Sequence, residues 1–206
     1  MEYLVTMTTH VPDGTSAEAV QDIRGREAAR SRDLAAQGHL LRLWRPPLQP
    51  AEWRTLGLFA ADDDAQLEKI LDSMPLRVWR TDQVTPLAPH PNDPDRETRE
   101  SGSPAAAAWR SEFLTTFTLT VPDGTPAGEV ANTDAREADR ARELAAHGHL
   151  LRLWRLPGPG RTLGLWHADN AAGLQAILAS LPLRAWMSVQ TTPLTTHPSD
   201  PAPASS

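Results

Sequence analysis

GHLLRLWR, at residues 38–45, returns unchanged at residues 148–155. Other phrases return around it in the same order: VPDGT at 11–15 and 121–125, REAAR at 26–30 with READR at 136–140, RTLGL at 54–58 and 161–165, PLR-x-W at 75–79 and 182–186, and TPL-x-x-HP at 85–91 and 192–198. Residues 2–95 and 112–201 are therefore a tandem duplication of one domain. Two copies of this length are too few for a solenoid, so we predict a pseudo-dimer on a single chain.

The composition excludes several functional classes. The 206 residues carry 40% apolar and 22% charged side chains, enough for two small cores or one continuous core. The chain has no cysteine, which excludes disulfides and thiolate chemistry. A net charge of -6 gives no basic footprint for nucleic acid. The N-terminal residues do not resemble a signal peptide and no apolar run is long enough to cross a bilayer, so we expect a cytoplasmic protein with no membrane partner.

The pattern within the first repeat predicts six elements. They are a strand at 3–10, a helix at 16–37, strands at 39–45 and 54–60, a helix at 62–73 and a strand at 77–87. The order β-α-β-β-α-β is that of the ferredoxin-like split βαβ motif, an antiparallel sheet with both helices on one face. The second repeat follows the same order from Phe113 to Leu194. We therefore predict an α+β protein made of two ferredoxin-like repeats.

The strand at 39–45 is apolar on both of its faces, which is typical of a sheet that is covered on both sides. Packing the two repeats sheet against sheet would cover the second face, so we predict a pseudo-dimer of the dimeric α/β-barrel type. The domain boundaries follow from the repeats. We expect repeat 1 at 1–95, a charged and then small-residue linker at 96–111, repeat 2 at 112–201 and a tail at 202–206.

A carboxylate interrupts the apolar stripe of the first helix in each repeat. Glu27 follows Ile23 at a spacing of four residues and precedes Leu34 on the same helical face, and Glu137 repeats this position. Burial raises the pKa of a carboxyl group toward the range of a useful general base, so Glu27 and Glu137 are candidate catalytic residues. The alternative is a structural ion pair with a sheet arginine such as Arg42 or Arg45.

The repeated strand also carries candidate substrate-binding residues. Arg42, Trp44 and Arg45, with their counterparts Arg152, Trp154 and Arg155, combine guanidinium groups with a flat apolar indole wall. Because an arginine fork matches a carboxylate, this combination suits a small organic acid. Strand alternation sends Arg42 and Trp44 to one face and Arg45 to the other. The alternative is that Trp44 belongs to the core and the arginines are surface residues or partners of glutamates.

Two pairs of histidines recur at matching positions. His39 and His149 open the second strand of each repeat, where they could transfer protons, and His90 and His197 follow the last strand, where the chain could close over a cavity. No His-x-His pair, HExxH motif or acidic cluster indicates a metal, and no glycine-rich motif indicates a nucleotide. We therefore expect neither a metal nor another cofactor.

The sequence resembles the muconolactone delta-isomerase family of the beta-ketoadipate pathway. The resemblance rests on MEYLVTMTTHVPDGT at 1–15, IRGREAARSRDLAAQG at 23–38, HLLRLWR at 39–45 and MPLRVWRTDQVTPLAPHP at 74–91, and the second repeat matches with more drift. The family implies single-domain ferredoxin-like subunits that assemble into rings built from dimers. It also implies a cofactor-free conversion of muconolactone to 3-oxoadipate enol-lactone. We expect a lactone carboxylic acid as substrate and a homo-oligomer of fused pseudo-dimers.

That reaction assigns roles to the candidate residues. Glu27 would move the proton, Arg42 or Arg45 would hold the carboxylate or dienolate, Trp44 would wall the lactone ring, and His39 or His90 would donate a hydrogen bond. The equivalent residues of repeat 2 predict a second working site, within or between the repeats. Two other functions stay open: a cofactor-free cyclase, monooxygenase or isomerase acting on a larger substrate, and a non-catalytic small-molecule binding module.

Overall fold

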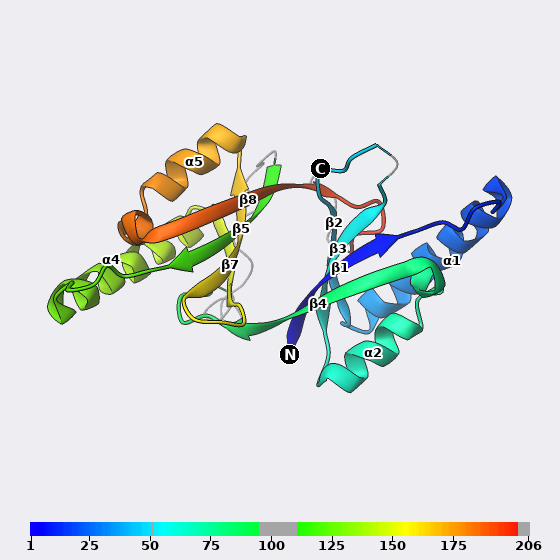
Figure 1. Cartoon of the computed structure of the whole chain (residues 1–206), viewed down its shortest axis with the longest axis horizontal. Coiled ribbons are helices and arrows are strands. Elements are labelled where there is room, and N and C mark those ends of the chain that lie inside the picture. The colour runs from blue at the N-terminus through cyan, green and yellow to red at the C-terminus, as the bar shows by residue number, and fades with distance from the viewer. Residues whose placement is uncertain (51, 95–110, 202–206) are drawn as a thin grey trace. The chain divides into compact units, whose positions relative to one another are not determined.

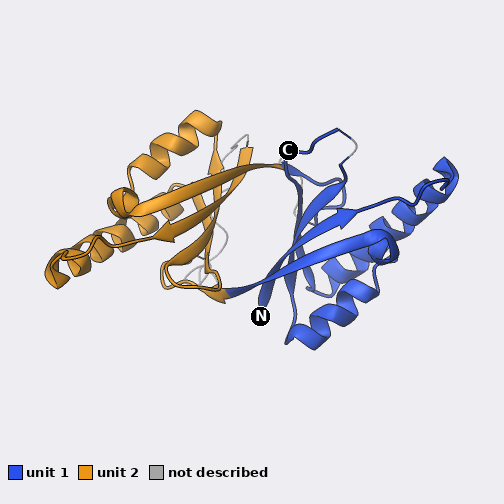
Figure 2. Cartoon of the chain, in the orientation of Figure 1, with its two compact units in different colours: residues 1–87, 195–204, 206 blue, residues 88–194, 205 orange. Residues whose placement is uncertain are grey.

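The computed structural model describes residues 1–50, 52–94 and 111–201, which form two compact units (Figure 2). Unit 1 contains Met1–Leu87 together with the segment that begins at Thr195, and unit 2 spans Ala88–Leu194. The predicted linker, apart from Ser111, and the predicted tail at 202–206 lie outside the described residues.

The predicted order of elements is confirmed in both repeats (Figure 1). Repeat 1 contains β1 (Glu2–Thr9), α1 (Ala17–Ala36), β2 (Leu40–Arg45), β3 (Arg54–Ala60), α2 (Asp64–Asp72), the 3₁₀ helix η1 (Pro75–Trp79) and β4 (Arg80–Pro89). Repeat 2 contains β5 (Ser111–Leu119), α4 (Ala127–Ala146), β6 (Leu150–Arg155), β7 (Arg161–Ala168), α5 (Ala171–Ala179), η2 (Pro182–Trp186) and β8 (Met187–Thr196). The sequence prediction began the last strand of repeat 1 at residue 77, whereas a 3₁₀ turn occupies this position and β4 begins at Arg80.

Local sequence explains where the long helix α1 begins and ends. The Ser16 hydroxyl accepts a hydrogen bond of 3.1 Å from Ala19 N, which satisfies one of the free amides of the first turn. The chain leaves the helix at Gly38, whose φ of 75° is a left-handed conformation that glycine adopts without strain. Gly148 repeats this conformation after α4. Pro126 precedes α4 and provides no side-chain cap, but the two helices have the same length, so Glu27 and Glu137 occupy equivalent positions along them.

Each unit has an antiparallel sheet whose last pairing comes from the other repeat. In unit 1 the order is β4-β1-β3-β2, and Thr195 and Thr196 of β8 then pair with Arg45 and Trp44 of β2. In unit 2 the order is β8-β5-β7-β6, and the end of β4 pairs with the end of β6 in the same way. The two repeats therefore exchange their strand ends, and the compact units do not coincide with the repeats at 1–95 and 112–201.

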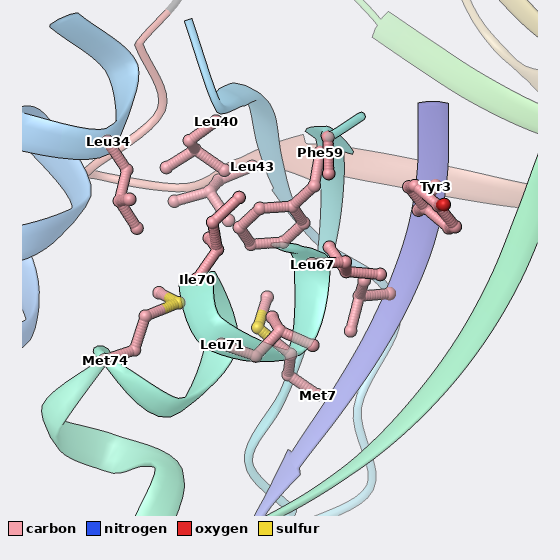
Figure 3. Close-up of a cluster of buried hydrophobic side chains, with 12 residues drawn as sticks. Tyr3, Met7, Leu34, Leu40, Leu43, Phe59, Leu67, Ile70, Leu71 and Met74 are labelled. Carbon is pink, nitrogen blue, oxygen red and sulfur yellow. The ribbon is translucent and has the colours of Figure 1, made fainter. Parts of the chain in front are cut away.

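The core of unit 1 lies between its sheet and its helices, and Figure 3 shows its central side chains. Tyr3 and Phe59 from the sheet and Leu34 and Leu71 from the helices are completely buried there. In unit 2, Trp166 replaces Phe59, and its Nε1 donates a hydrogen bond of 2.8 Å to the Thr115 hydroxyl. Buried indole N–H groups need such an acceptor. The helices of each unit thus cover one face of its sheet, and the α+β class with ferredoxin-like repeats is confirmed.

Candidate active site

Each unit contains a cavity lined by a glutamate, an arginine and a histidine at equivalent positions. The cavity of unit 2, here the unit 2 cavity, has a volume of about 490 Å³. Its wall includes Glu137 from α4, Arg155 from the end of β6 and His90 from the segment after β4. The exchanged strand end of β4 brings His90 into unit 2, so one repeat supplies the histidine and the other supplies the glutamate and arginine.

The cavity of unit 1, here the unit 1 cavity, is smaller, at about 190 Å³. Glu27 of α1, Arg45 of β2 and His197, which follows β8, line it. Both cavities therefore combine three of the residue types that the sequence singled out. The sequence left open whether a site lies within a repeat; here each compact unit holds its own cavity, built from residues of both repeats.

Glu137 has the environment of a general base. Its Oε2 accepts a hydrogen bond of 2.9 Å from Leu183 N at the start of η2. Burial raises the pKa of Glu137, the Leu183 amide opposes that rise, and nearby Asp134 adds to it. In the part of the chain that the structure describes, no arginine, lysine or histidine forms an ion pair with Glu137. A carboxylate with a raised pKa in an accessible cavity can accept and return a proton near neutral pH.

Glu27 has the same backbone contact but a different side-chain partner. Its Oε2 accepts a hydrogen bond of 2.9 Å from Leu76 N, and its Oε1 accepts one of 3.2 Å from Arg80 Nη1. Burial raises the pKa of Glu27, while the Leu76 amide and the Arg80 guanidinium oppose the rise. Arg80 is buried and also pairs with Asp82 at 2.6 Å. From the sequence, Arg42 or Arg45 was the candidate ion-pair partner of Glu27, but the structure shows that Arg80 is the partner.

Arg42 and Trp44 lie outside the residues that line the unit 1 cavity. The Arg42 guanidinium packs over the Trp44 ring at 4.8 Å and pairs with Asp200 at 3.1 Å, and Trp44 itself is buried. Asp200 also accepts a hydrogen bond of 2.8 Å from Leu43 N. This geometry favours the alternative that Trp44 belongs to the core and the arginine is a structural partner, here of an aspartate.

The equivalent residues of unit 2 repeat this arrangement. Arg152 packs over Trp154 at 4.6 Å and contacts Asp93 at 3.3 Å, and Leu153 N donates to Asp93 at 3.0 Å. Arg152 and Trp154 do not line the unit 2 cavity either. Side chains alternate between the two faces of a strand. Arg45 and Arg155 therefore face the cavities, whereas Arg42 and Arg152 point to the opposite face.

The two predicted histidine pairs occupy different places. His39 and His149 approach the backbone carbonyls of Ala60 and His167 through Nδ1, at 3.1 and 3.2 Å, and neither histidine lines the unit 1 cavity or the unit 2 cavity. Their predicted catalytic role therefore has no support from geometry.

His90 and His197, in contrast, line the cavities and are held in one orientation. Their Nδ1 atoms accept hydrogen bonds of 3.1 Å from the amides of Asn92 and Ser199. Burial lowers the pKa of both histidines, to about 4 for His197, and the charges of Arg155 and Arg45 add to this effect. Because Nδ1 accepts, the neutral ring carries its proton on Nε2 and can donate it to a ligand.

Several residues that build these sites were not predicted from the sequence. Asp93 and Asp200 bind the segments that carry His90 and His197 to the neighbouring strands, and the amides of Leu76 and Leu183 bind the glutamates. The repeated pattern His-Pro-x-Asp, at 90–93 and 197–200, was the available signal for the aspartates. Across the described residues, no cluster of histidine, aspartate and glutamate side chains could hold a metal ion, and no helix is long and apolar enough to span a membrane.

The family model of muconolactone delta-isomerase matches residues 1–93 and again residues 111–200. The chain belongs to this family. A muconolactone delta-isomerase of Acinetobacter lwoffii is 32% identical over 92 residues, which are 45% of this chain and 93% of that protein. A muconolactone delta-isomerase of Cupriavidus pinatubonensis is also 32% identical over 92 residues, covering 45% of this chain and 97% of the relative. Such a relative thus corresponds to about half of this chain, whereas the family model matches both repeats.

Solved structures resemble the whole duplicated chain of this family member. A heme-binding protein from Thermus thermophilus has a TM-score of 0.61 at 12% identity and covers 97% of this chain and 93% of its own. A mutant chlorite dismutase from Candidatus Nitrospira defluvii has a TM-score of 0.57 at 10% identity and covers 94% and 91%. At these identities the likeness concerns the fold alone. It confirms the predicted fold class, an α+β protein built from two ferredoxin-like repeats.

Proposed function

We propose that this protein is a cofactor-independent isomerase that shifts the ring double bond of muconolactone, or of a close lactone acid, with Glu137 as the base. One observation carries the proposal. Glu137 is a largely buried carboxylate with a raised pKa in the wall of a cavity of about 490 Å³, and the Leu183 amide holds it through Oε2. The family, shown by both halves of the chain, supplies the reaction class.

The proposed reaction needs a single carboxylate. Glu137 removes the ring proton that is acidified through conjugation with the lactone carbonyl, which forms a dienolate and a neutral glutamic acid. The same group then returns the proton at the other end of the conjugated system, so the double bond moves and nothing is oxidised or reduced. Because one group carries out both transfers, no second base is required.

The neighbouring residues support the charge changes of this reaction. Arg155 lines the same cavity and offers a guanidinium fork for the substrate carboxylate. His90 is neutral and oriented by Asn92, so its Nε2 can donate to the oxygen that becomes negative in the dienolate. The unit 1 cavity has the same three residue types, in Glu27, Arg45 and His197. There the glutamate is also bound by Arg80.

The first test is turnover of muconolactone by the full-length chain in deuterated water, followed by NMR of the ring protons. Replacing Glu137 by Gln keeps the size and removes the base, so we expect turnover to fall by about 100-fold or more. Asp139→Asn is the matched control, because Asp139 is an exposed residue of the same helix, paired with Arg142. Turnover in Glu137→Gln at the wild-type rate would refute the assignment.

A larger substrate is the second candidate, and the lining of the unit 2 cavity favours it. Phe117, Leu119, Leu153 and Met187 give this cavity a mainly apolar wall. A cofactor-free isomerase, cyclase or monooxygenase acting on a bulkier molecule would use such a wall for binding. A folded protein that leaves muconolactone unchanged, but whose tryptophan fluorescence responds to larger lactones, would favour this second function.

A further inference from the structure

The two cavities have equivalent positions but different charges. In unit 2, Met187 and Val189 occupy the positions of Arg80 and Asp82, so the buried ion pair beside Glu27 has no counterpart beside Glu137. On the long helix, Arg24 of unit 1 is replaced by Asp134 in unit 2. These substitutions remove a positive charge at one place on the cavity wall and reverse the sign of charge at another.

The unit 1 cavity carries an excess of positive charge. Arg24, Arg45 and Arg80 line it, and Glu27 is its carboxylate. Within the described ranges, no carboxylate pairs with Arg24 or Arg45, while Arg80 is shared between Glu27 and Asp82. Two guanidinium groups without acidic partners at one cavity attract a small anion, and their planar forks match a carboxylate.

Glu27 is held in a way that opposes proton transfer. One of its oxygens accepts from the Leu76 amide and the other accepts from Arg80, whose side chain is 2% exposed. Protonating Glu27 would remove the charge that this buried guanidinium faces, and a protonated oxygen would accept a much weaker hydrogen bond from it. Met187 imposes no such constraint on Glu137, so equivalent carboxylates have unequal freedom to exchange protons.

Unit 1 also has an aromatic group that unit 2 lacks. Trp53, from the connection between β2 and β3, lines the unit 1 cavity, and Arg24 packs over its ring at 5.2 Å. The connection between β6 and β7 is shorter and contains no tryptophan. An indole beside two guanidinium groups suits a flat, unsaturated carboxylate, because the ring contacts its face while the forks bind its oxygens.

We propose that the unit 1 cavity is a binding site for a small organic carboxylate that it does not turn over, and that proton transfer takes place in the unit 2 cavity. The second half rests on the proposed function, whereas the first half stands on the unit 1 cavity alone. Arg24, Arg45 and Trp53 are the residues that hold the ligand, and Arg80 holds Glu27 in an ion pair.

Binding is tested with the saturated lactone acid obtained by reducing the ring double bond of muconolactone, because this probe cannot isomerise. Calorimetry on the full chain is expected to find two molecules per chain, one in each cavity. Arg24→Met combined with Arg45→Met should reduce this to one, and Arg155→Met should remove the other site. Tryptophan fluorescence, compared with Trp53→Phe, should change on binding in wild type and fail to change in the double arginine variant. One molecule per chain in wild type, with no response from Trp53, would overturn the proposal.

Turnover tests the division between the units. Glu137→Gln should lower turnover at least 100-fold while the probe still changes Trp53 fluorescence. Adding Arg80→Met and Asp82→Val, which gives unit 1 the side-chain types of unit 2, should restore turnover at least tenfold in that background. Half of the wild-type turnover in Glu137→Gln would show that unit 1 is catalytic and would overturn the inference. If the wild-type protein does not convert muconolactone, the proposed function fails, and the binding experiment still decides whether unit 1 holds a carboxylate.

Discussion

At the scale of single residues, the same glutamate occupies two chemical environments in one chain. The helical period of α1 and α4 was enough to predict that Glu27 and Glu137 face the sheet, because the spacing to neighbouring apolar residues fixes the face. It could not predict Arg80 as a partner, since Arg80 approaches from β4, more than fifty residues away. Sequence periodicity predicts which face of the helix carries a residue, but the contacts of its side chain depend on the tertiary structure.

The pH dependence of turnover follows from the raised pKa of Glu137. The base must be ionised, so we expect turnover to fall as the pH drops through the pKa of Glu137, with a midpoint above that of an ordinary glutamate. Replacing Asp134 by Asn removes a nearby negative charge that raises this pKa, so the acid limb should move to lower pH. A pH profile of kcat measures the shift. Asp139→Asn is the control, and an unchanged profile in Asp134→Asn would contradict the electrostatic account.

The two glutamates should also differ in their effect on stability. Burial disfavours the ionised form of Glu137, so the stability held by its neutral form is present at low pH and is lost as the pH rises through its raised pKa. Glu137→Gln should therefore stabilise the protein near neutral pH, by about 0.5–2 kcal/mol, and by less in mild acid. Glu27→Gln should gain less, because Arg80 already offsets the burial of Glu27. Chemical denaturation at two pH values measures both, and equal gains would argue against a stabilising role for Arg80.

At the scale of elements, the helices and most strands could be predicted because their signals are local. The Ser16 cap, the turn at Gly38 and the strand alternation lie within a few residues of the boundaries that they set. The turn η1 was missed because PLR-x-W has no distinctive period, and its Leu76 amide is bound by Glu27 from a distant helix. The exchange of strand ends was missed for the same reason, since pairing of Thr195 and Thr196 with β2 is a long-range contact.

The segment after each last strand is held by its aspartate. Asp93 is 6% exposed and binds both the Arg152 guanidinium and the Leu153 amide. Replacing Asp93 by Ala leaves the buried Leu153 amide without its acceptor and removes one ion-pair partner of Arg152, so we expect a loss of about 2–4 kcal/mol. It should also lower turnover, because His90 lies three residues earlier in the same segment. Urea denaturation and kcat measure the two effects, with exposed Asp33→Asn as the control.

The equivalent change in unit 1 separates the two units. Asp200 contacts Arg42 and Leu43 as Asp93 contacts Arg152 and Leu153. Asp200→Ala should therefore cost a similar amount of stability but lower turnover less than Asp93→Ala, since it loosens His197 and not His90. Equal losses of turnover in the two variants would contradict the assignment of catalysis to unit 2.

At the scale of the whole molecule, the duplication has joined two domains whose compact units each require both repeats. Unit 1 takes Thr195 and the residues after it from repeat 2, and unit 2 takes the end of β4 and His90 from repeat 1. Repeats expressed as two separate chains, 1–95 and 111–206, should therefore purify as one complex when they are made together. Each repeat made alone would leave an unpaired strand end and a cavity without its histidine. We expect such a chain to be destabilised and inactive, and mixing the two refolded chains should restore turnover of the lactone acid. Size-exclusion chromatography and the NMR assay measure assembly and activity, and a stable, active repeat 2 on its own would show that the exchanged segment is dispensable.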